Sequence, residues 1–393
     1  MHPESRNRGG RDRLPHRQAR LVSAAMNLET LHRAKGRGVL FVTGGGSGVL
    51  GQLLTVPGAS RTVLDAQVPY SAGALAELLG RPPEQAASAS TARNLAMVAF
   101  QRARKLDGEA GFGLGATAAL ATERAKAGDH RIHVALQTPG TSYLWSLTFE
   151  KGARSRGEEE AVSEALILHA LFIAKRLTQE EPALPLGVAD LLTTDHVAGE
   201  PAWQGLLLGS AAVVPRGPPL SPEAALLPGA FNPVHEGHRA MARLAAERLD
   251  RPVAYELSVF NVDKPPLNYA DLRDRLSAFG PEESVVLTHA PRFTDKAELF
   301  PRRTFVVGAD TILRVGDVRY YGDSRGAQDA ALTRLGEREV QFLVFGRLRE
   351  DRFETLTDLK LPPALTQLCD GVSETEFRSD LSSTALRRAL LNP

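Results

Sequence analysis

One stretch, residues 226–238, constrains the fold of this chain most strongly. The apolar run that ends at Leu227 predicts a buried strand. Gly229 permits a tight turn with close backbone approach, and Pro233 suits the first positions of a helix. Residues 239–249 then alternate apolar and charged side chains at helical spacing. The stretch therefore predicts a strand that turns directly into a helix.

Two histidines lie on this turn. His235 and His238 are three residues apart, which places both on one face of the chain. The turn puts free N–H groups and the positive end of a helix dipole in front of any ligand. Two imidazoles add donors that can stabilise a transferring phosphoryl group, so the pattern indicates a phosphate site. A structural or a metal-binding histidine pair is the alternative interpretation.

The stretch resembles the signature of the adenylyl/cytidylyl (nucleotidyl) transferase superfamily, Gly-x-Phe-Asp-Pro-x-His-x-Gly-His. Every fixed position matches except the aspartate, which is Asn232 here. Asparagine keeps the size and a hydrogen-bonding oxygen, so we expect the turn geometry to survive and any role of a carboxylate to be lost. The resemblance implies catalytic roles for two residues and nucleotide-binding roles for five, namely His235 and His238, and Gly229, Ala230, Phe231, Asn232 and Gly237.

A second motif lies near the end of the chain. Ser382, Ser383 and Thr384 precede a helical pattern, and one hydroxyl would suffice as a helix cap. Three hydroxyls, a helix N-terminus and Arg387 predict a second anion site. The motif resembles the superfamily's Ile-Ser-Ser-Thr-x-Ile-Arg, with Leu386 in place of the second isoleucine. The resemblance implies that these residues hold the triphosphate tail of a nucleotide, with Arg387 in a catalytic role.

The residues after the first motif predict further strands and helices in alternation. The strands are expected at 253–262, 285–288, 303–310 and 341–345, with helices at 270–279, 296–299 and from 311. This order predicts an α/β domain with a Rossmann-like doubly wound parallel sheet, the nucleotidyltransferase fold. Ligands of such sheets lie beyond the carboxyl ends of the strands, which would bring Lys264 near His235. An exposed loop lysine is the alternative.

The fourth of these strands ends in Gly308 and Asp310. Asp310 is placed to accept hydrogen bonds from ribose hydroxyls, or to cap the following helix. Residues 305–311 resemble the Gly-Ala-Asp segment of nicotinamide or nicotinate mononucleotide adenylyltransferases. The resemblance implies ATP as a substrate and a Mg²⁺ ion that is held mostly by the phosphates and water. We expect no metal site built by the protein itself.

The N-terminal half shows a different pattern. A strand at 38–42 leads into the glycine-rich turn 43–48, and such a turn can cradle an anion. From Thr43 to about Leu177 the sequence resembles the CinA C-terminal domain family, which includes nicotinamide-nucleotide amidohydrolases.

The departures from that family concern its catalytic residues. Thr43 stands at the position of the nucleophilic serine, and Gly45 stands at the following threonine. Tyr70 is present, but Leu75 replaces the activating lysine. Leucine cannot take a proton from a hydroxyl nucleophile, so we expect a degenerate amidase site. Nucleotide binding at the glycine turn and a dimerisation or scaffolding role both remain open.

The length of 393 residues accommodates two domains. We expect a disordered basic tail (1–25), a CinA-like α/β domain (26–178), a connecting segment rich in proline and glycine (179–224) and the nucleotidyltransferase domain (225–393). A transit peptide, a basic arm or an upstream start codon before Met26 are alternative readings of the tail.

The composition excludes several classes of partner. The net charge of +1 gives no global argument for nucleic acid or membrane binding, and the apolar runs are too short to span a bilayer. The single cysteine, Cys369, suits a reducing compartment. We therefore expect a cytoplasmic protein that binds small-molecule nucleotides, without nucleic-acid or membrane partners, and a possible homo-oligomer through the N-terminal domain.

The two resemblances lead to one functional hypothesis. The C-terminal half would transfer an adenylyl group from ATP to a phosphate acceptor, nicotinamide or nicotinate mononucleotide, and release pyrophosphate. The N-terminal half resembles enzymes of the same metabolite, but that is an association, since folds do not fix substrates. The alternatives are a cytidylyltransferase, an adenylyltransferase with another acceptor, and a non-catalytic nucleotide sensor or scaffold.

Overall fold

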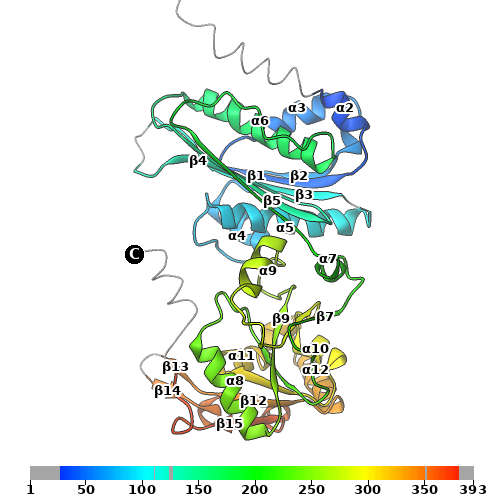
Figure 1. Cartoon of the computed structure of the whole chain (residues 1–393), viewed down its shortest axis with the longest axis vertical. Coiled ribbons are helices and arrows are strands. Elements are labelled where there is room, and N and C mark those ends of the chain that lie inside the picture. Colours follow the sequence, from blue (N-terminus) through cyan, green and yellow to red (C-terminus); the bar gives the residue numbers. More distant parts are fainter. Residues whose placement is uncertain (1–26, 110, 124–126, 350–351, 380–393) are drawn as a thin grey trace, which may run out of the picture. The chain divides into compact units, whose positions relative to one another are not determined.

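The structure is a computed structural model that describes residues 27–109, 111–123, 127–349 and 352–379. The chain divides into two compact units, residues 1–198 and 199–393, and Figure 1 labels many of their helices and strands. Each unit mixes helices with a sheet, which confirms the predicted α/β class. The basic tail and the C-terminal hydroxyl motif lie outside the described residues.

The N-terminal unit is built on a six-stranded sheet in the order β2-β1-β3-β4-β5-β6. β1 pairs in parallel with β2 and β3, and the remaining neighbours are antiparallel. The strands are β1 (Gly38–Thr43), β2 (Val63–Gln67), β3 (Phe112–Ala119), β4 (His130–Gln137), β5 (Thr141–Phe149) and β6 (Leu191–Ala198).

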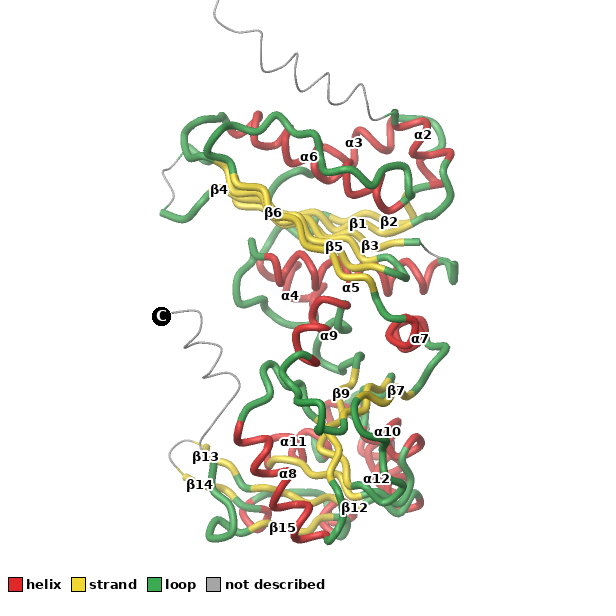
Figure 2. Tube along the Cα trace, viewed as in Figure 1, coloured by secondary structure: helices red, strands yellow, loops and turns green. Residues whose placement is uncertain are grey.

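Helices cover both faces of this sheet, as Figure 2 shows. One face carries α2 (Leu28–Arg33), α3 (Gly48–Thr55) and α6 (Arg156–Ala174), and the other carries α4 (Ala72–Leu79) and α5 (Ala89–Leu106). The long helix α6 is apolar on most of its surface because it is buried against the sheet.

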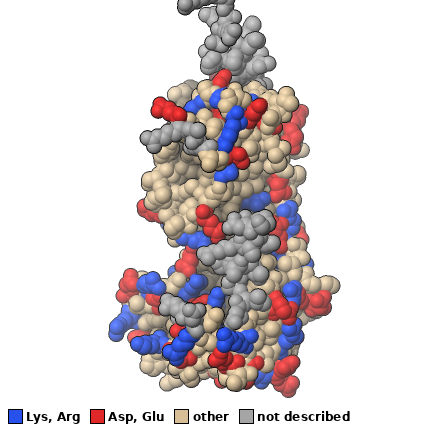
Figure 3. Space-filling model, turned by 90° about the vertical axis from the view of Figure 1, so that its left-hand side faces the viewer, with Lys and Arg blue, Asp and Glu red and all other residues tan. Residues whose placement is uncertain are grey.

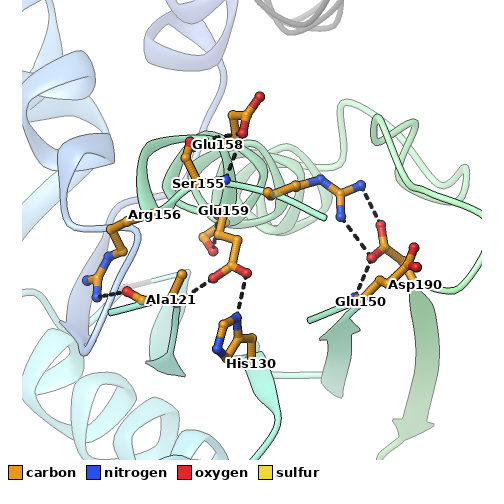
Figure 4. A network of polar contacts seen from close by, with 10 residues as sticks. Ala121, His130, Glu150, Ser155, Arg156, Glu158, Glu159 and Asp190 are labelled. Atoms are coloured by element: carbon orange, nitrogen blue, oxygen red, sulfur yellow. Dashed lines mark hydrogen bonds and ion pairs between the residues drawn. The ribbon is translucent and has the colours of Figure 1, made fainter. Parts of the chain in front are cut away.

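Polar contacts fix the first turn of α6 (Figure 4). The carboxylate of Glu159 is fully buried and accepts hydrogen bonds from the Ala121 amide at 2.6 Å and from His130 Nδ1 at 2.8 Å. Just before the helix, Arg154 pairs with Asp190, which lies next to β6. A buried carboxylate is tolerated only when it is hydrogen-bonded, so these contacts set the position of α6.

The C-terminal unit contains a seven-stranded sheet in the order β15-β12-β11-β8-β9-β10-β7. All neighbours are parallel except β7, which pairs antiparallel with β10. The strands are β7 (Val213–Arg216), β8 (Ala225–Pro228), β9 (Val253–Ser258), β10 (Val285–Thr288), β11 (Thr304–Gly308), β12 (Gln341–Phe345) and β15 (Cys369–Val372).

This strand order is that of a doubly wound sheet. After the edge strand β7, the chain enters the middle of the sheet at β8 and moves to one side through β9 and β10. It then returns to β11 beside β8 and moves to the other side through β12 and β15. The predicted doubly wound parallel sheet is confirmed, and its topological switch point lies between β8 and β11.

Helices and short segments connect these strands. They are α7 (Pro201–Leu208), α8 (Glu236–Leu249), α9 (Tyr269–Leu276), α10 (Phe293–Leu299), α11 (Ala309–Val315), α12 (Arg325–Glu337) and α13 (Pro363–Thr366), with a two-stranded ribbon of β13 (Arg347–Arg349) and β14 (Arg352–Glu354). Short 3-10 turns are at Ala59–Arg61, Val318–Tyr321 and Leu356–Asp358. Within the described parts of the chain, no helix is long and apolar enough to cross a membrane.

The stretch 179–224, expected as a connecting segment, is divided between the two units. β6 completes the first sheet, whereas α7 and β7 belong to the second unit. α7 forms within this stretch because its helical face buries Trp203, Leu206 and Leu207.

Two further boundaries differ from the predictions. The strand expected over 253–262 ends at Ser258, because the loop folds back and the Leu267 amide donates to the Val259 carbonyl. Pro233 lies in the turn before α8 instead of in its first positions, since His235 is the N-cap of that helix.

A buried ion pair links α10 to the sheet. Lys296 Nζ lies 2.7 Å from both carboxylate oxygens of Glu256 on β9, and donates to the Ala290 carbonyl at 2.8 Å. Thr288 on β10 also donates to Glu256. Glu256 is 1% exposed and Lys296 is 4% exposed, so loss of either partner would leave the other as an unpaired buried charge.

We expect Lys296→Met to lower the free energy of unfolding of the C-terminal unit by about 3–5 kcal/mol, because Glu256 would remain buried without its cation. Of the two tryptophans, Trp203 belongs to this unit, so urea unfolding can be followed by its fluorescence in a Trp145→Phe background. Arg334→Met, which removes an exposed pair with Glu298, is the control and should change stability by less than about 1 kcal/mol. Equal effects of both changes would contradict the role of the buried pair.

Candidate functional site

The histidine-bearing turn lies at the carboxyl end of β8, where the sheet has its switch point. The turn runs from Gly229 to the N-cap residue His235, and α8 follows at once. The neighbouring strand β11 ends at Gly308 on the same edge. In open α/β sheets this edge is where ligands bind, so the fold presents the turn at the place where a nucleotide would lie.

Phe231 anchors the turn. It is only 1% exposed and has a left-handed backbone with φ of 42°. Its ring packs edge-on against His238, Tyr255 and Phe279, with centroids 5.2, 5.5 and 5.3 Å apart. A Cβ atom on Gly229 would lie 2.5 Å from this ring, so only glycine permits the close approach. The Gly-x-Phe spacing is therefore explained by the packing of the Phe231 ring over Gly229.

The two imidazoles lie against one another, with ring centroids 3.8 Å apart. The backbone amide of His235 donates to Nδ1 of His238 at 3.2 Å. Because Nδ1 is an acceptor, the proton of neutral His238 lies on Nε2, which becomes a hydrogen-bond donor. The Nδ1 atom of His235 is buried and has no hydrogen-bond partner among the described residues.

Burial and nearby positive charge keep both imidazoles neutral. Burial, and then the charges of His235, Arg239 and Arg347, together lower the pKa of His238 to about 4. The pKa of His235 is also lowered, by burial, then by Arg347 and Arg239. An anion placed here would reverse these effects, because it favours the protonated form. The site therefore disfavours cations and is suited to an anionic group.

Two arginines hold the turn and the helix that follows it. Arg275 on α9 donates to the Ala230 carbonyl at 2.8 Å. Arg239 on α8 pairs with Glu283 at 3.0 Å and donates to the Ala278 carbonyl. These contacts fix the turn and α8 in the absence of a ligand, so a ligand would meet a preorganised site.

The other residues predicted for this site are placed as follows. Asp310 lies in the first turn of α11, but Gly308 is the N-cap, so the capping interpretation of Asp310 is wrong. Its carboxylate pairs with Arg347 at 2.5 Å. Lys264 lies exposed on the loop between β9 and α9, and its approach to His235 remains a prediction.

Arg347 was missed by the sequence analysis. It follows β12 after Gly346, so its position behind an apolar strand was a usable signal, since the carboxyl ends of parallel strands share one edge. Its relation to the two histidines depends on β12 lying two strands from β8, which the sequence does not show.

The described chain ends close to the histidine turn. The position of a Cβ atom on Gly237 would lie 3.1 Å from Ser379 Oγ, so the chain passes the N-terminus of α8 at this residue. Glycine at 237 permits that approach. The predicted triphosphate residues Ser382, Ser383, Thr384 and Arg387 lie outside the described residues.

The residues at the predicted amidase site of the N-terminal unit do not form a nucleophile with a general base. Thr43 is buried, and its hydroxyl donates to the Pro69 carbonyl at 2.9 Å. Gly45 is packed so closely that a Cβ atom would lie 2.5 Å from Leu120. Tyr70 is 72% exposed, and Leu75 belongs to the core. The hydroxyl thus faces a carbonyl oxygen, which cannot act as its general base.

Carboxylates of the chain itself occupy the glycine turn. The Gly46 amide donates to Glu160, which also pairs with Arg156 at 2.7 Å. Arg156 donates in turn to the Gly44 carbonyl at 3.0 Å. Glu164 accepts from Gln52 on α3 at 2.5 Å. The positions where a bound anion would meet the turn are thus taken by glutamates, which argues against nucleotide binding there.

The sheet order, with a histidine turn at its switch point, defines the C-terminal unit as a doubly wound α/β domain. Residues 226–389 match the family model described as Cytidylyltransferase-like. The match supports an activity of nucleotidyltransferase type for this unit.

Among solved structures, the chain is similar to three competence- or damage-related proteins. They are the protein CihA from Agrobacterium tumefaciens (21% identity, 42% of this chain and 96% of that chain, TM-score 0.29), a protein from Enterobacter asburiae (15%, 41% and 98%, 0.30) and a CinA superfamily protein from Enterobacter cloacae (13%, 45% and 100%, 0.29). No curated protein matches the chain.

The lowered pKa of His238 predicts a pH dependence of stability. An unfolded chain protonates this imidazole near pH 6.5, whereas the folded chain does so only at about 4. The unfolded state therefore binds more protons in between, and the contribution of His238 to stability is lost as the pH falls from 6.5 to 4. We expect urea midpoints of His238→Gln to fall less steeply over this range than those of the wild type. An imidazole NMR titration of His238 with a midpoint near 6.5 would contradict the prediction.

Proposed function

We propose that the C-terminal unit transfers an adenylyl group from ATP to nicotinamide or nicotinate mononucleotide and releases pyrophosphate. The observation that carries the proposal is the His238 Nε2–H donor, fixed by the His235 amide at the switch point of the sheet. The match of residues 226–389 to a nucleotidyltransferase-type family supports the same class of reaction.

The reaction needs no nucleophile from the protein. A phosphate oxygen of the acceptor attacks the α-phosphorus of ATP, and the bond from that phosphorus to the bridging oxygen breaks as pyrophosphate leaves. Charge grows on the oxygens of the α-phosphate, next to His235 and His238. The Nε2–H of His238 and backbone amides of the first turn of α8 donate to these oxygens, and positioning supplies the rest of the catalysis.

In this proposal the C-terminal hydroxyl motif holds the β- and γ-phosphates. Ser379 lies beside Gly237, and Ser382 follows three residues later. Three residues of chain span at most about 11 Å, so the motif is within reach of a triphosphate that starts at the histidine turn. Ser383, Thr384 and Arg387 would complete the contacts to the phosphates.

The remaining residues have assigned roles in the same proposal. Asp310 accepts hydrogen bonds from the ribose, and Lys264 approaches the phosphates from the loop after β9. Mg²⁺ is carried by the phosphate oxygens and water, and when bound it neutralises their charge. The described residues include no group of three or more histidine, cysteine or acidic side chains that could hold the ion, and Asn232 offers an amide instead of a carboxylate.

Transfer of a cytidylyl group is the second candidate, because the matching family is described as Cytidylyltransferase-like. A screen of ATP and CTP against nicotinamide mononucleotide, nicotinate mononucleotide and other phosphate acceptors distinguishes the candidates. Pyrophosphate release identifies an active pair, and mass spectrometry identifies the product. Binding of nucleotides without turnover on any acceptor would contradict the proposal and favour a sensor.

We expect His238→Ala to lower turnover by at least about two orders of magnitude, the usual cost of losing one transition-state donor. The measurement is the initial rate of pyrophosphate release at saturating ATP and acceptor. His196→Ala, which changes an exposed histidine of the N-terminal unit, is the control and should retain wild-type turnover. Near-normal activity of His238→Ala would refute the assigned phosphate position.

We expect Thr43→Ala to leave pyrophosphate release unchanged. Thr43 belongs to the N-terminal unit, and its hydroxyl donates to the Pro69 carbonyl of the same unit. The wild type should release no ammonia from nicotinamide mononucleotide. Ammonia release that Thr43→Ala abolishes would show that the N-terminal unit is an active amidase.

A further inference from the structure

The ribbon of β13 and β14 places an arginine at the nucleotide edge of the sheet. The ribbon begins directly after β12, and Arg347 is its first residue. A Cβ atom on Gly346 would lie 2.5 Å from the Phe353 ring, so the chain must turn closely at this point. The pairing of Arg347 with Glu354 and of Leu348 with Phe353 then fixes the start of the ribbon.

The segment that approaches the histidine turn packs against this ribbon. Phe377 lies edge-on to Phe345 at 4.9 Å, and the Arg378 guanidinium lies 5.6 Å from the Phe353 ring centre. Ser379 then reaches Gly237 on α8. The segment 377–379 therefore contacts β12, the ribbon and the N-terminus of α8 in turn. Figure 3 shows the side of the C-terminal unit that carries the ribbon, where many Lys and Arg side chains gather among acidic ones.

Arg347 is held by the residue expected to bind ribose. Its guanidinium lies 2.5 Å from the Asp310 carboxylate, and the side chains are 45% and 37% exposed. β11 and β12 are parallel neighbours with Gly308 opposite Phe345, so both residues follow carboxyl ends that lie side by side. An ion pair this exposed contributes no more than about 1 kcal/mol to stability. Its partners can therefore be exchanged for a ligand at little cost to the fold.

The charge of Arg347 also acts on the two imidazoles. It contributes to the lowered pKa of both His235 and His238, so the guanidinium lies within electrostatic range of each ring. An anion bound at the imidazole pair would thus meet a positive group from the opposite half of the sheet.

We propose that Arg347 binds the phosphate chain of the nucleotide, and that Asp310 holds it in place until the nucleotide arrives. The inference rests on the proposed function of the same site. When the guanidinium turns to the phosphates, the Asp310 carboxylate is released for the ribose hydroxyls. Binding of the phosphates by Arg347 thus favours binding of the ribose by Asp310. A ligand with both phosphates and ribose should therefore bind more tightly than its separate parts would suggest. The planar fork of arginine matches phosphate oxygens in a way that lysine does not.

Tripolyphosphate tests the proposal, because it offers the phosphates without the ribose. Its affinity for the full chain can be measured by calorimetry at constant ionic strength. We expect Arg347→Gln to weaken binding at least about tenfold, the cost of one charge-assisted contact. We expect Asp310→Asn to strengthen it, because the competing carboxylate is gone. In the variant that carries both substitutions, the gain in affinity from Asp310→Asn should vanish, since Asp310 acts through Arg347.

The same ribbon supplies matched controls. Arg352 on β14 also pairs with an aspartate, Asp358, at 2.5 Å. Arg352→Gln and Asp358→Asn change the charge equally and should leave the affinity for tripolyphosphate within about twofold of the wild type. Arg347→Lys keeps the charge without the fork and should bind between the wild type and Arg347→Gln.

Three results would overturn the inference. In the first, Arg347→Gln binds tripolyphosphate like the wild type while His238→Ala loses this binding. The proposed function would then stand, and Arg347 would have no part in it. A gain in Asp310→Asn that survives in the double variant would show a general charge effect. No binding of tripolyphosphate or ATP by the wild type would refute both proposals together. Thermal unfolding of each variant shows whether it is folded, and the Asp310→Asn comparison holds even if Arg347→Gln is unstable.

Discussion

The hydrogen bond from the His235 amide to His238 Nδ1 determines what this molecule can do. It assigns the proton of a neutral imidazole to Nε2 and so turns His238 into a donor at the N-terminus of α8. The bond forms because Phe231, buried in a left-handed conformation, packs against His238 and passes over Gly229. A phosphate at this point would meet a donor that is oriented before binding, which is the condition for electrostatic catalysis.

The order of the strands converts this local arrangement into a site. Because β8 lies in the centre of the sheet and the chain later returns to β11 beside it, residues far apart in sequence follow strand ends on one edge. His238 follows β8, Asp310 follows β11, and Arg347 follows β12. Ser379 approaches from the end of the described chain. The N-terminal unit uses its glycine turn differently, since Glu160 of its own helix α6 accepts the amide hydrogen bond that an anion would take.

The sequence predicts the parts of this molecule that are governed by local pattern. β10 and β12 have the expected bounds because a parallel strand buried on both faces appears as a continuous apolar run. β6 was missed because it is an exposed edge strand whose residues show no apolar run. Arg347 and Glu160 were missed as site residues for another reason. Their partners lie 37 and 114 residues away, and only the folded sheet brings them together.

The central claim is that the α-phosphate of a nucleoside triphosphate lies against the His238 Nε2–H. The most direct test is the imidazole spectrum of the ¹⁵N-labelled full chain during titration with α,β-methylene ATP, which cannot be cleaved at the reacting bond. The account predicts that the Nε2 resonance of His238 shifts as the ligand binds, while the resonances of His196 in the other unit stay in place. Saturation of the protein with the ligand and no change at His238 would contradict it.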